Sequence, residues 1–237
     1  MSQDDPQIPI FELLPAFEEE TGVRVKPRPV VAAALDERAA PGASLRVLAT
    51  RVRALGRDKR LRRVGVVGCG PGEGATTIAL GLARALAAEP RQRVLYLELD
   101  LKRPSADRAL GLSASAVGVT QFLEGKSEVP VLRHPASGLW VLSSGATRAK
   151  PLDPLAADRL PRLLSAADRV FDFVIGDCPP LLPDAGTLAL QDHFDGFVFV
   201  VRSRHAALET VARAARMLRQ GLVVGFVLNA QRDILKR

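Results

Sequence analysis

The sequence predicts an α/β protein with a doubly wound, mostly parallel sheet. Apolar runs that are continuous rather than alternating, such as Phe197-Val-Phe-Val-Val201, recur along the chain. Such runs are typical of parallel strands that are buried on both faces. Segments with apolar residues at helical spacing stand between them, and this alternation is the pattern of crossover connections in a parallel sheet.

The expected elements follow in order from about residue 43. A helix is expected over Ala43–Gly56, because Leu45, Leu48 and Val52 fall on one face. The chain of 237 residues is long enough for one sizeable core. Strands are expected at 64–68, 93–99, 139–142, 171–176, 196–201 and 223–228, and helices at 76–88, 119–124, 154–168 and 206–219.

Residues 1–41 differ from the rest of the chain, and we interpret them as an N-terminal arm and linker ahead of one domain at 42–237. Ile8–Phe17 carries apolar side chains around two prolines, which suits a short docking segment. Residues 21–41 hold three prolines and are interpreted as linker.

The net charge of +7 is unevenly distributed, because residues 1–20 are acidic and residues 46–63 are strongly basic. The basic stretch can be a solvated helix face, a partner interface or a nucleic-acid surface. Aromatic residues are few and are not interleaved with the arginines, which disfavours a platform for stacked bases. We therefore expect no nucleic-acid partner.

Targeting and redox signals are weak along the whole chain. No apolar run reaches the roughly 18 residues of a membrane span, so we expect no transmembrane segment. The acidic start lacks the basic and apolar regions of a signal peptide. Two cysteines, Cys69 and Cys178, do not make a disulfide framework, which favours the reducing cytoplasm.

The most informative loop, residues 69–76, joins the first core strand to the next helix. Its glycines allow backbone N–H groups to point at an anion, aided by the helix N-terminus. Thr76 stands where a P-loop hydroxyl ligates Mg²⁺, whereas the position of the phosphate-binding lysine is Ala75. The alternative is a tight turn without a ligand. The candidate nucleotide-binding residues of the loop are Gly70, Gly72, Glu73, Gly74, Ala75, Thr76 and Thr77.

Two further loops carry carboxylates where strands end. Glu98 and Asp100 leave one apolar strand, and Asp177 ends another in a Walker-B arrangement. Ligands of open α/β sheets bind beyond the carboxyl ends of the strands, so we expect the three loops to converge. Local ion pairs and a strand-end cap are the alternatives. We take Glu98, Asp100 and Asp177 as candidate catalytic carboxylates, and Thr76, Asp100 and Asp177 as candidate Mg²⁺ ligands.

Together these loops resemble the cytoplasmic domain of bacterial tyrosine kinases, the capsular and exopolysaccharide branch of the deviant P-loop ATPases related to MinD and ParA. The similarity covers roughly residues 43–230. The resemblance implies a deviant P-loop NTPase-like fold, ATP or ADP with Mg²⁺ as cofactors, Asn229 beside the adenine base, and a membrane polysaccharide copolymerase as partner. It is carried by Pro71–Thr77, Leu97–Pro104 and Ile175–Leu182, with support from Gly118–Gly125, Gly138–Leu142, Asp195–Arg202 and Gly225–Asn229.

The nucleotide site departs from the family pattern. Ala75 replaces the P-loop lysine, the alternative signature lysine falls at Gly70, and the family's Asp-x-Asp-x-Arg becomes Glu98-Leu-Asp-Leu-Lys102. A charge-assisted hydrogen bond to phosphate contributes about 1.5–3 kcal/mol, so nucleotide binding is expected to be weak or absent. Losing one donor to the transition state costs about 10²–10³ in rate. The substitute cations we consider are Arg103, Arg202 and Arg204.

The assembly signals depart as well. The oligomerisation motif Glu-x-x-Arg-x-x-Arg keeps only Arg46, because Ala43 and Ala49 fill the other places. The chain as given ends at Arg237, without the family's tyrosine-rich tail, and its only tyrosine is Tyr96 in an expected core strand. We therefore expect a homo-oligomer only together with a partner.

We accordingly expect a catalytically impaired relative of a tyrosine kinase, which acts as an accessory or regulator of exopolysaccharide synthesis and export. It is expected to be cytoplasmic and held at the inner membrane by the cytoplasmic face of its copolymerase partner. One alternative is an active ATP-dependent kinase or ATPase of the same pathway. Another is a ParA/MinD-like positioning ATPase, although the signature lysine of that group is missing.

Overall fold

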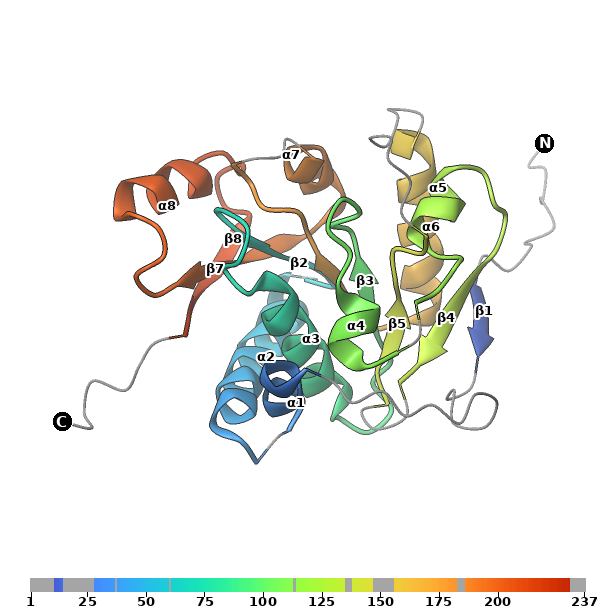
Figure 1. Ribbon diagram of the computed structural model, residues 1–237, viewed down its shortest axis with the longest axis horizontal. Helices are drawn as coiled ribbons and strands as arrows, with labels where there is room; N and C mark the ends of the chain where they lie inside the picture. Colours follow the sequence, from blue (N-terminus) through green and yellow to red (C-terminus); the bar gives the residue numbers. More distant parts are fainter. Residues whose placement is uncertain are drawn as a thin grey trace.

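The computed structural model describes residues 11–14, 28–36, 38–59, 61–112, 114–134, 138–146, 156–182 and 186–230. Within this part, the chain forms one eight-stranded sheet in the order β1-β4-β5-β3-β6-β2-β7-β8 (Figure 1). The strands are β1 (Phe11–Leu14), β2 (Arg63–Gly68), β3 (Val94–Glu98), β4 (Val129–Arg133), β5 (Trp140–Leu142), β6 (Phe173–Asp177), β7 (Gly196–Arg202) and β8 (Val223–Asn229).

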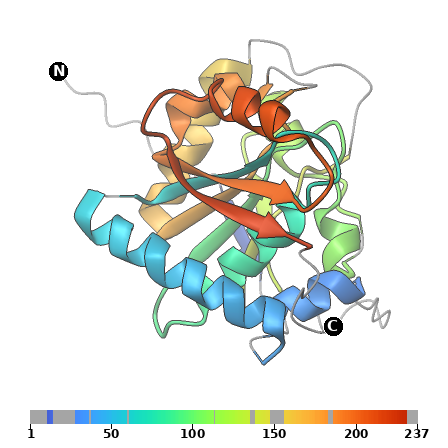
Figure 2. The same ribbon diagram turned by 90° about the vertical axis from the view of Figure 1, so that its left-hand side faces the viewer.

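All neighbouring strands are parallel except β4 and β5, which are antiparallel. Strands β3, β6, β2 and β7 lie side by side at the centre, and β8 is the edge strand at the front of Figure 2. The register pairs Glu98 at the end of β3 with Asp177 at the end of β6. The predicted functional loops therefore leave the sheet at one edge.

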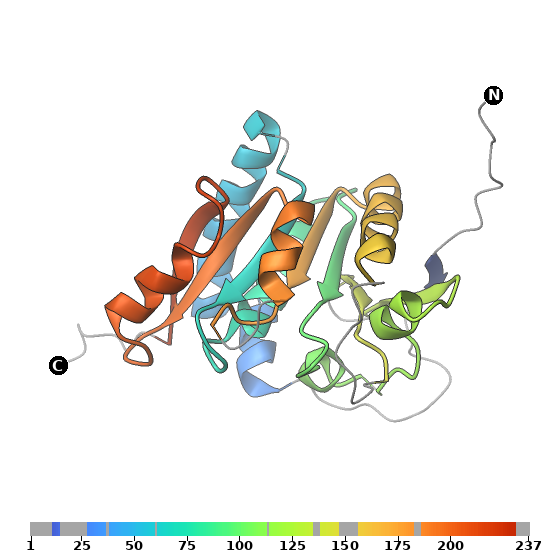
Figure 3. The ribbon, with the colours of Figure 1, turned by 90° about the horizontal axis from the view of Figure 1, so that it is seen from above.

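Helices cover both faces of the sheet, as the prediction of a doubly wound fold requires (Figure 3). One face carries α1 (Pro29–Leu35), α2 (Ala40–Lys59), α3 (Ala75–Ala87) and α4 (Ala106–Leu110). The other carries α5 (Val119–Leu123), α6 (Ala156–Val170), α7 (Gly186–Leu190) with the 3₁₀ turn η1 (Gln191–His193), and α8 (Leu208–Ala215).

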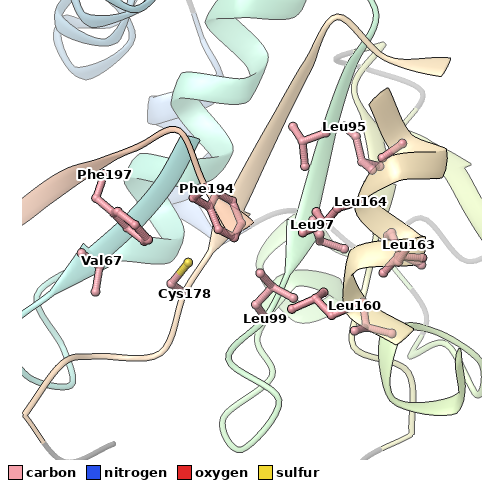
Figure 4. Close-up of a cluster of buried hydrophobic side chains, with 14 of the residues drawn as sticks. Val67, Leu95, Leu97, Leu99, Leu160, Leu163, Leu164, Cys178, Phe194 and Phe197 are labelled. Carbon is pink, nitrogen blue, oxygen red and sulfur yellow. The ribbon is translucent and has the colours of Figure 1, made fainter. Parts of the chain in front are cut away.

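The two halves of the core use alternate side chains of the same strands. Leu95 and Leu97 of β3 lie on the face covered by α6, whose Leu163 packs in the same cluster (Figure 4). Tyr96 between them belongs to the opposite cluster and is fully buried. Because both faces are apolar, the strands are continuous apolar runs, as the sequence indicates.

Every predicted core strand and helix is present, although α8 covers only Leu208–Ala215 of the predicted 206–219, and several short elements are not predicted from the sequence. Within the predicted linker, Pro29–Leu35 is the helix α1, so the linker interpretation of this part is wrong. It packs on α2 and α3. Helices α4 and α7 and strand β4 are also unpredicted.

Part of the predicted arm belongs to the sheet. Phe11–Leu14 forms β1, which pairs in parallel with β4, and the ring of Phe11 lies 6.1 Å from that of Phe171 between centroids. The remaining residues of Ile8–Phe17 lie outside the described residues. The described part of the predicted docking segment is therefore a strand of the chain's own sheet.

The basic stretch supplies structural contacts near the amino ends of the strands. Arg53 donates to the carbonyls of Ala85 and Leu86 at the end of α3, at 2.8 and 3.1 Å. Arg62 donates to carbonyls at the end of α6, including that of Phe171 at 2.7 Å. Cations suit helix C-termini because unpaired carbonyls gather there. In the described part of the chain, no helix is long and apolar enough to cross a membrane.

Candidate nucleotide site

The three predicted loops converge on one cavity of about 300 Å³ at the carboxyl edge of the central strands. This confirms the predicted meeting of the P-loop turn with the ends of β3 and β6. Among the predicted site residues, Glu98 and Asn229 do not line the cavity. Those that do are Gly70, Gly72, Glu73, Gly74, Ala75, Thr76, Thr77, Asp100 and Asp177.

Two glycines give the loop its shape. Gly72 and Gly74 have φ values of +83° and +94°, in the left-handed region that favours glycine. A Cβ on Gly74 would lie 2.2 Å from Nδ2 of Asn229, so this position has no room for a side chain. Gly74 then caps α3, and its carbonyl accepts the N–H of Ile78 at 3.1 Å.

Glu73 fixes the loop to the sheet. Its carboxylate is buried. Oε1 accepts a hydrogen bond from the thiol of Cys69, with Sγ 2.9 Å away, and Oε2 accepts one from the backbone N–H of Arg202. Burial raises the pKa of Cys69 to about 11, and the hydrogen bond to Glu73 contributes to the same shift. The thiol therefore stays protonated and can donate this hydrogen bond. Asn229 donates to the Glu73 carbonyl at 2.8 Å. These contacts hold the turn from both β7 and β8.

Asp177 is the central carboxylate of the cavity. It is 2% exposed, and its Oδ2 accepts a hydrogen bond from the Tyr96 hydroxyl at 2.7 Å. Burial raises its pKa to about 7, and the charges of Glu98 and Asp100 act in the same direction, while hydrogen bonds with Thr76 and Tyr96 act against it. A raised pKa from burial beside like charges is characteristic of functional carboxylates.

Asp100 approaches the cavity from the neighbouring loop. Its side chain is 17% exposed and pairs with Arg103, with Nε and Oδ2 3.2 Å apart. Ser105, later in the same loop, places its hydroxyl 3.4 Å from that of Thr76. The loop is thereby joined to the first turn of α3.

Glu98 has a different environment from the other two carboxylates. Its Oε1 accepts the N–H groups of Ser105 and Ala106 at 2.6 and 2.8 Å, and its Oε2 accepts that of Ser144 at 2.9 Å. The side chain is 1% exposed. These bonds tie two loops together, so the contacts favour a positioning role for Glu98, while a catalytic role stays a prediction.

The oxygen donors fit Mg²⁺ shared with a phosphate. Thr76 offers a hydroxyl, and Asp100 and Asp177 offer carboxylates, which are the hard ligands that Mg²⁺ prefers. The described residues hold no group of three or more His, Cys, Asp or Glu side chains suited to a metal. One hydroxyl and two carboxylates suit an ion that keeps waters and substrate oxygens rather than a closed protein cage.

The cations considered from the sequence do not line the cavity. Arg103 pairs with Asp100, and Arg202 donates to the Gly72 carbonyl at 3.2 Å. Arg204 lies in the turn after β7 with a φ of +59°. Arg28, which precedes α1, lines the cavity instead.

Arg28 and Ser105 line the cavity but are not among the residues predicted from the sequence. Ser105 follows the carboxylate loop directly, so its hydroxyl is a signal that could have been used. Arg28 lies in a proline-rich segment with no motif, and only the packing of α1 brings it to the P-loop.

Comparison with known proteins relates this chain to bacterial tyrosine-protein kinases. No protein-family model matches the chain. The chain is 30% identical to tyrosine-protein kinase YwqD of Bacillus subtilis over 191 residues, which are 79% of this chain and 80% of the relative. It is 28% identical to tyrosine-protein kinase etk of Escherichia coli, but it spans only 24% of that relative.

Solved structures agree with the fold. The kinase domain of VpsO matches with a TM-score of 0.71 and 27% identity, over 81% of this chain and 96% of that domain. The kinase domain of Escherichia coli ETK matches with a TM-score of 0.77 and 22% identity, over 95% and 92% of the two chains. The septum site-determining protein MinD from Pyrococcus horikoshii, complexed with Mg-ADP, matches with a TM-score of 0.53 and 18% identity, over 70% and 69%. The last two show the fold alone, which is the predicted α/β fold with a mostly parallel sheet.

Proposed function

Because the chain belongs to the family of bacterial tyrosine-protein kinases, we propose that it is a member that binds Mg-nucleotide but transfers phosphate poorly. We further propose that it serves as an accessory or regulatory component of exopolysaccharide synthesis and export. The observation that carries the first proposal is Ala75 at the start of α3, inside a site whose other parts are assembled.

The retained residues have separate tasks in this proposal. Backbone N–H groups of the glycine-rich turn and the N-terminus of α3 bind phosphate oxygens. Thr76, Asp100 and Asp177 would hold Mg²⁺, which when bound neutralises charge on the phosphates. Tyr96 and Thr76 orient Asp177 through hydrogen bonds.

The missing charge limits the chemistry. Ala75 supplies no donor to the transferred phosphoryl group, and removing one such donor typically costs about 10²–10³ in rate. The only tyrosine, Tyr96, is fully buried in β3 and bonded to Asp177, so it is not presented for phosphorylation. The missing charge supports a role that depends on binding rather than on turnover, and the burial of Tyr96 disfavours phosphorylation at that residue.

The proposed partner is the cytoplasmic face of a membrane polysaccharide copolymerase, which would hold this chain at the inner membrane. The chain covers 80% of YwqD but only 24% of etk. Co-purification with a copolymerase from the same genome tests this part. If none is retained when both proteins are produced together, the partner proposal is wrong.

We also propose that the isolated chain does not assemble through the oligomerisation motif of its family. Arg46 is exposed on α2, but Ala49 is fully buried against the core and cannot present a basic side chain to a neighbour. Light scattering on the purified protein tests this proposal. A stable particle of about eight subunits without any partner would contradict it.

The catalytic proposal is tested with the full chain and Mg-ATP. Calorimetry is expected to show saturable binding, and mass spectrometry is expected to find no phosphotyrosine on the protein or on added tyrosine substrates. Ala75→Lys serves as the control that restores the missing charge. Phosphotyrosine formed by the unaltered protein at a rate equal to that of Ala75→Lys would overturn the proposal and favour the active-kinase alternative.

A further inference from the structure

The charge inside the cavity is unbalanced. Among the described lining residues, the charged side chains are those of Arg28, Glu73, Asp100 and Asp177. The carboxylate of Glu73 is already bonded to Cys69 and Arg202. The cavity therefore offers Asp177, and Asp100 that also pairs with Arg103, for a metal, and one cationic side chain, Arg28, for an anion. A nucleotide phosphate brings further negative charge, so the position of this cation matters.

The backbone of Arg28 is held firmly. Its N–H donates to the carbonyl of Ala109 in α4 at 3.1 Å, and its carbonyl accepts the N–H groups of Val31 and Ala32 at 2.9 and 2.8 Å. Arg28 is thus the N-cap residue of α1. The chain cannot swing away at this point without breaking the first turn of that helix.

Helix α1 is itself seated closely on α3, the helix that begins at Ala75 (Figure 1). Val31 and Ala34 of α1 are 2% and 4% exposed. A Cβ added to Gly81 of α3 would lie 3.3 Å from that of Ala34, so the two backbones approach each other closely. The same helix pair therefore fixes the position of Arg28 relative to Ala75.

The side chain of Arg28 is available. Arg28 is exposed, and its guanidinium makes no ion pair with any residue in the described part of the chain. The other arginines near the loop are engaged elsewhere, since Arg103 pairs with Asp100 and Arg202 donates to Gly72. A guanidinium offers five donors in a planar fork, which suits two oxygens of one phosphate.

We propose that Arg28 binds the nucleotide phosphates and supplies the positive charge that the P-loop lacks at Ala75. This inference rests on the proposed nucleotide-binding function and assigns a further binding residue to the same site. The charge comes from a separate helix rather than from the loop itself. Phosphate binding therefore depends on the seating of α1 against α3.

The test is a calorimetric titration of the full chain with Mg-ADP. Arg28→Ala is expected to weaken binding by about tenfold or more, since a charge-assisted hydrogen bond is worth about 1.5–3 kcal/mol. Arg28→Glu should weaken it further by repulsion, whereas Arg28→Lys should keep part of the affinity. Arg38→Ala is the matched control, because Arg38 is exposed between α1 and α2 and does not line the cavity.

The Ala75→Lys background adds a second test. With a lysine in the loop, the loss caused by Arg28→Ala is expected to shrink to less than about threefold, because the two cations serve the same phosphates. A loss of equal size in both backgrounds would mean that the two residues do not replace each other, and it would overturn the inference. Circular dichroism melts verify that each variant is folded, which we expect because Arg28 is exposed.

Two further outcomes separate this inference from the proposed function. If the unaltered protein binds Mg-ADP and Arg28→Ala binds equally well, the inference is wrong and the nucleotide-binding proposal stands. If the unaltered protein does not bind while Ala75→Lys does, Arg28 does not compensate for the lysine. In that case both the inference and the proposed nucleotide binding of the natural chain are wrong.

Discussion

Aspartates stand at both ends of the central strands. At the amino ends they are hydrogen-bonded to neighbouring strands, and at the carboxyl ends they line a cavity. At the amino ends, Asp195 accepts the N–H groups of Arg62 and Arg63 at 2.8 and 2.7 Å, and Asp172 accepts that of Arg93 at 2.8 Å. These carboxylates extend the hydrogen-bond pattern from one strand to the next. At this end of the sheet, the carboxylates thus have backbone N–H groups of the protein as partners.

At the carboxyl ends, the acidic residues surround a cavity instead. Asp177 is buried with a pKa raised to about 7 by burial, and Asp100 lies beside it at the end of the next strand. The lining residues include one cation, Arg28. At the amino ends the carboxylates are bonded within the protein, whereas at the carboxyl ends they line a cavity, which supports the proposal that a ligand binds there.

The largest loss of stability is expected at the amino end. The half-buried guanidinium of Arg63 binds both carboxylate oxygens of Asp168, with Nε 3.1 Å from each. Arg63→Ala leaves Asp168 without this partner and should destabilise the fold by roughly 2–3 kcal/mol, after allowance for partial exposure. Calorimetric melts should show a Tm lower by about 5–10 °C.

If the two ends have separate roles, the loss of stability in Arg63→Ala should leave nucleotide binding unchanged. The nucleotide affinity of folded Arg63→Ala should equal that of the unaltered protein, and Arg51→Ala on the exposed face of α2 should change neither quantity. If Arg63→Ala kept its Tm but lost nucleotide binding, the two ends of the strands would not have separate roles.

Asp177→Asn should do the opposite of Arg63→Ala. The pKa of Asp177 is higher in the folded protein than its ordinary value of 3.8, so its contribution to stability is present at low pH and lost as the pH rises through about 7. Above that pH, the unliganded fold holds a buried charge at a cost of up to about 4 kcal/mol. The neutral amide removes this cost.

Thermal melts of Asp177→Asn near pH 8 should therefore give a Tm higher by roughly 5 °C, with the gain vanishing near pH 4. Mg-dependent nucleotide binding should fall by at least about tenfold, by analogy with changes around metal ligands. Asp192→Asn is a suitable control, because that side chain is 65% exposed. A lower Tm at high pH would show that Asp177 is a structural residue.

Ala75→Lys is expected to have a smaller effect on affinity. A lysine at the start of α3 should tighten Mg-ATP binding by about tenfold, at the lower end of the range for a charge-assisted hydrogen bond. The gain is limited if Arg28 already contacts the phosphates. Calorimetry measures the gain directly, and an unchanged affinity in both the natural and the Arg28→Ala backgrounds would show that the phosphates do not lie against the first turn of α3.

Tyr96→Phe should have the smallest effect. The change removes one hydrogen bond to Asp177 and keeps the ring in the core. A net hydrogen bond contributes about 0.5–1.5 kcal/mol, so Mg-nucleotide affinity should fall by about two- to tenfold. An affinity equal to that of the unaltered protein would exclude an orienting role for Tyr96.

The central strands, the main helices and the converging loops could be predicted because their signals are local. Continuous apolar runs identified β2, β3, β6 and β7, and strand ends in a parallel sheet must share an edge. The residues around Thr76 and Asp177 follow from that rule. The predicted burial of Tyr96 in a core strand is likewise confirmed.

The missed elements depend on distant packing. Three prolines led to a linker interpretation of residues 21–41, but Pro29 occupies the first turn of α1, where its missing N–H costs nothing. Pro130 hid β4, since proline is unusual inside a strand. The place of Arg28 at the cavity follows from the contact of α1 with α3, and no pattern in the sequence reports that contact.

The most direct test of the account is a calorimetric titration of the unaltered full chain with Mg-ATP. This titration reports on both nucleotide binding and phosphate transfer, because binding gives saturable heat and turnover gives heat that continues between injections. We predict saturable binding that is abolished by EDTA, with a baseline that returns to its starting value. Continuous heat of turnover, or no saturable binding at millimolar Mg-ATP, would contradict the account.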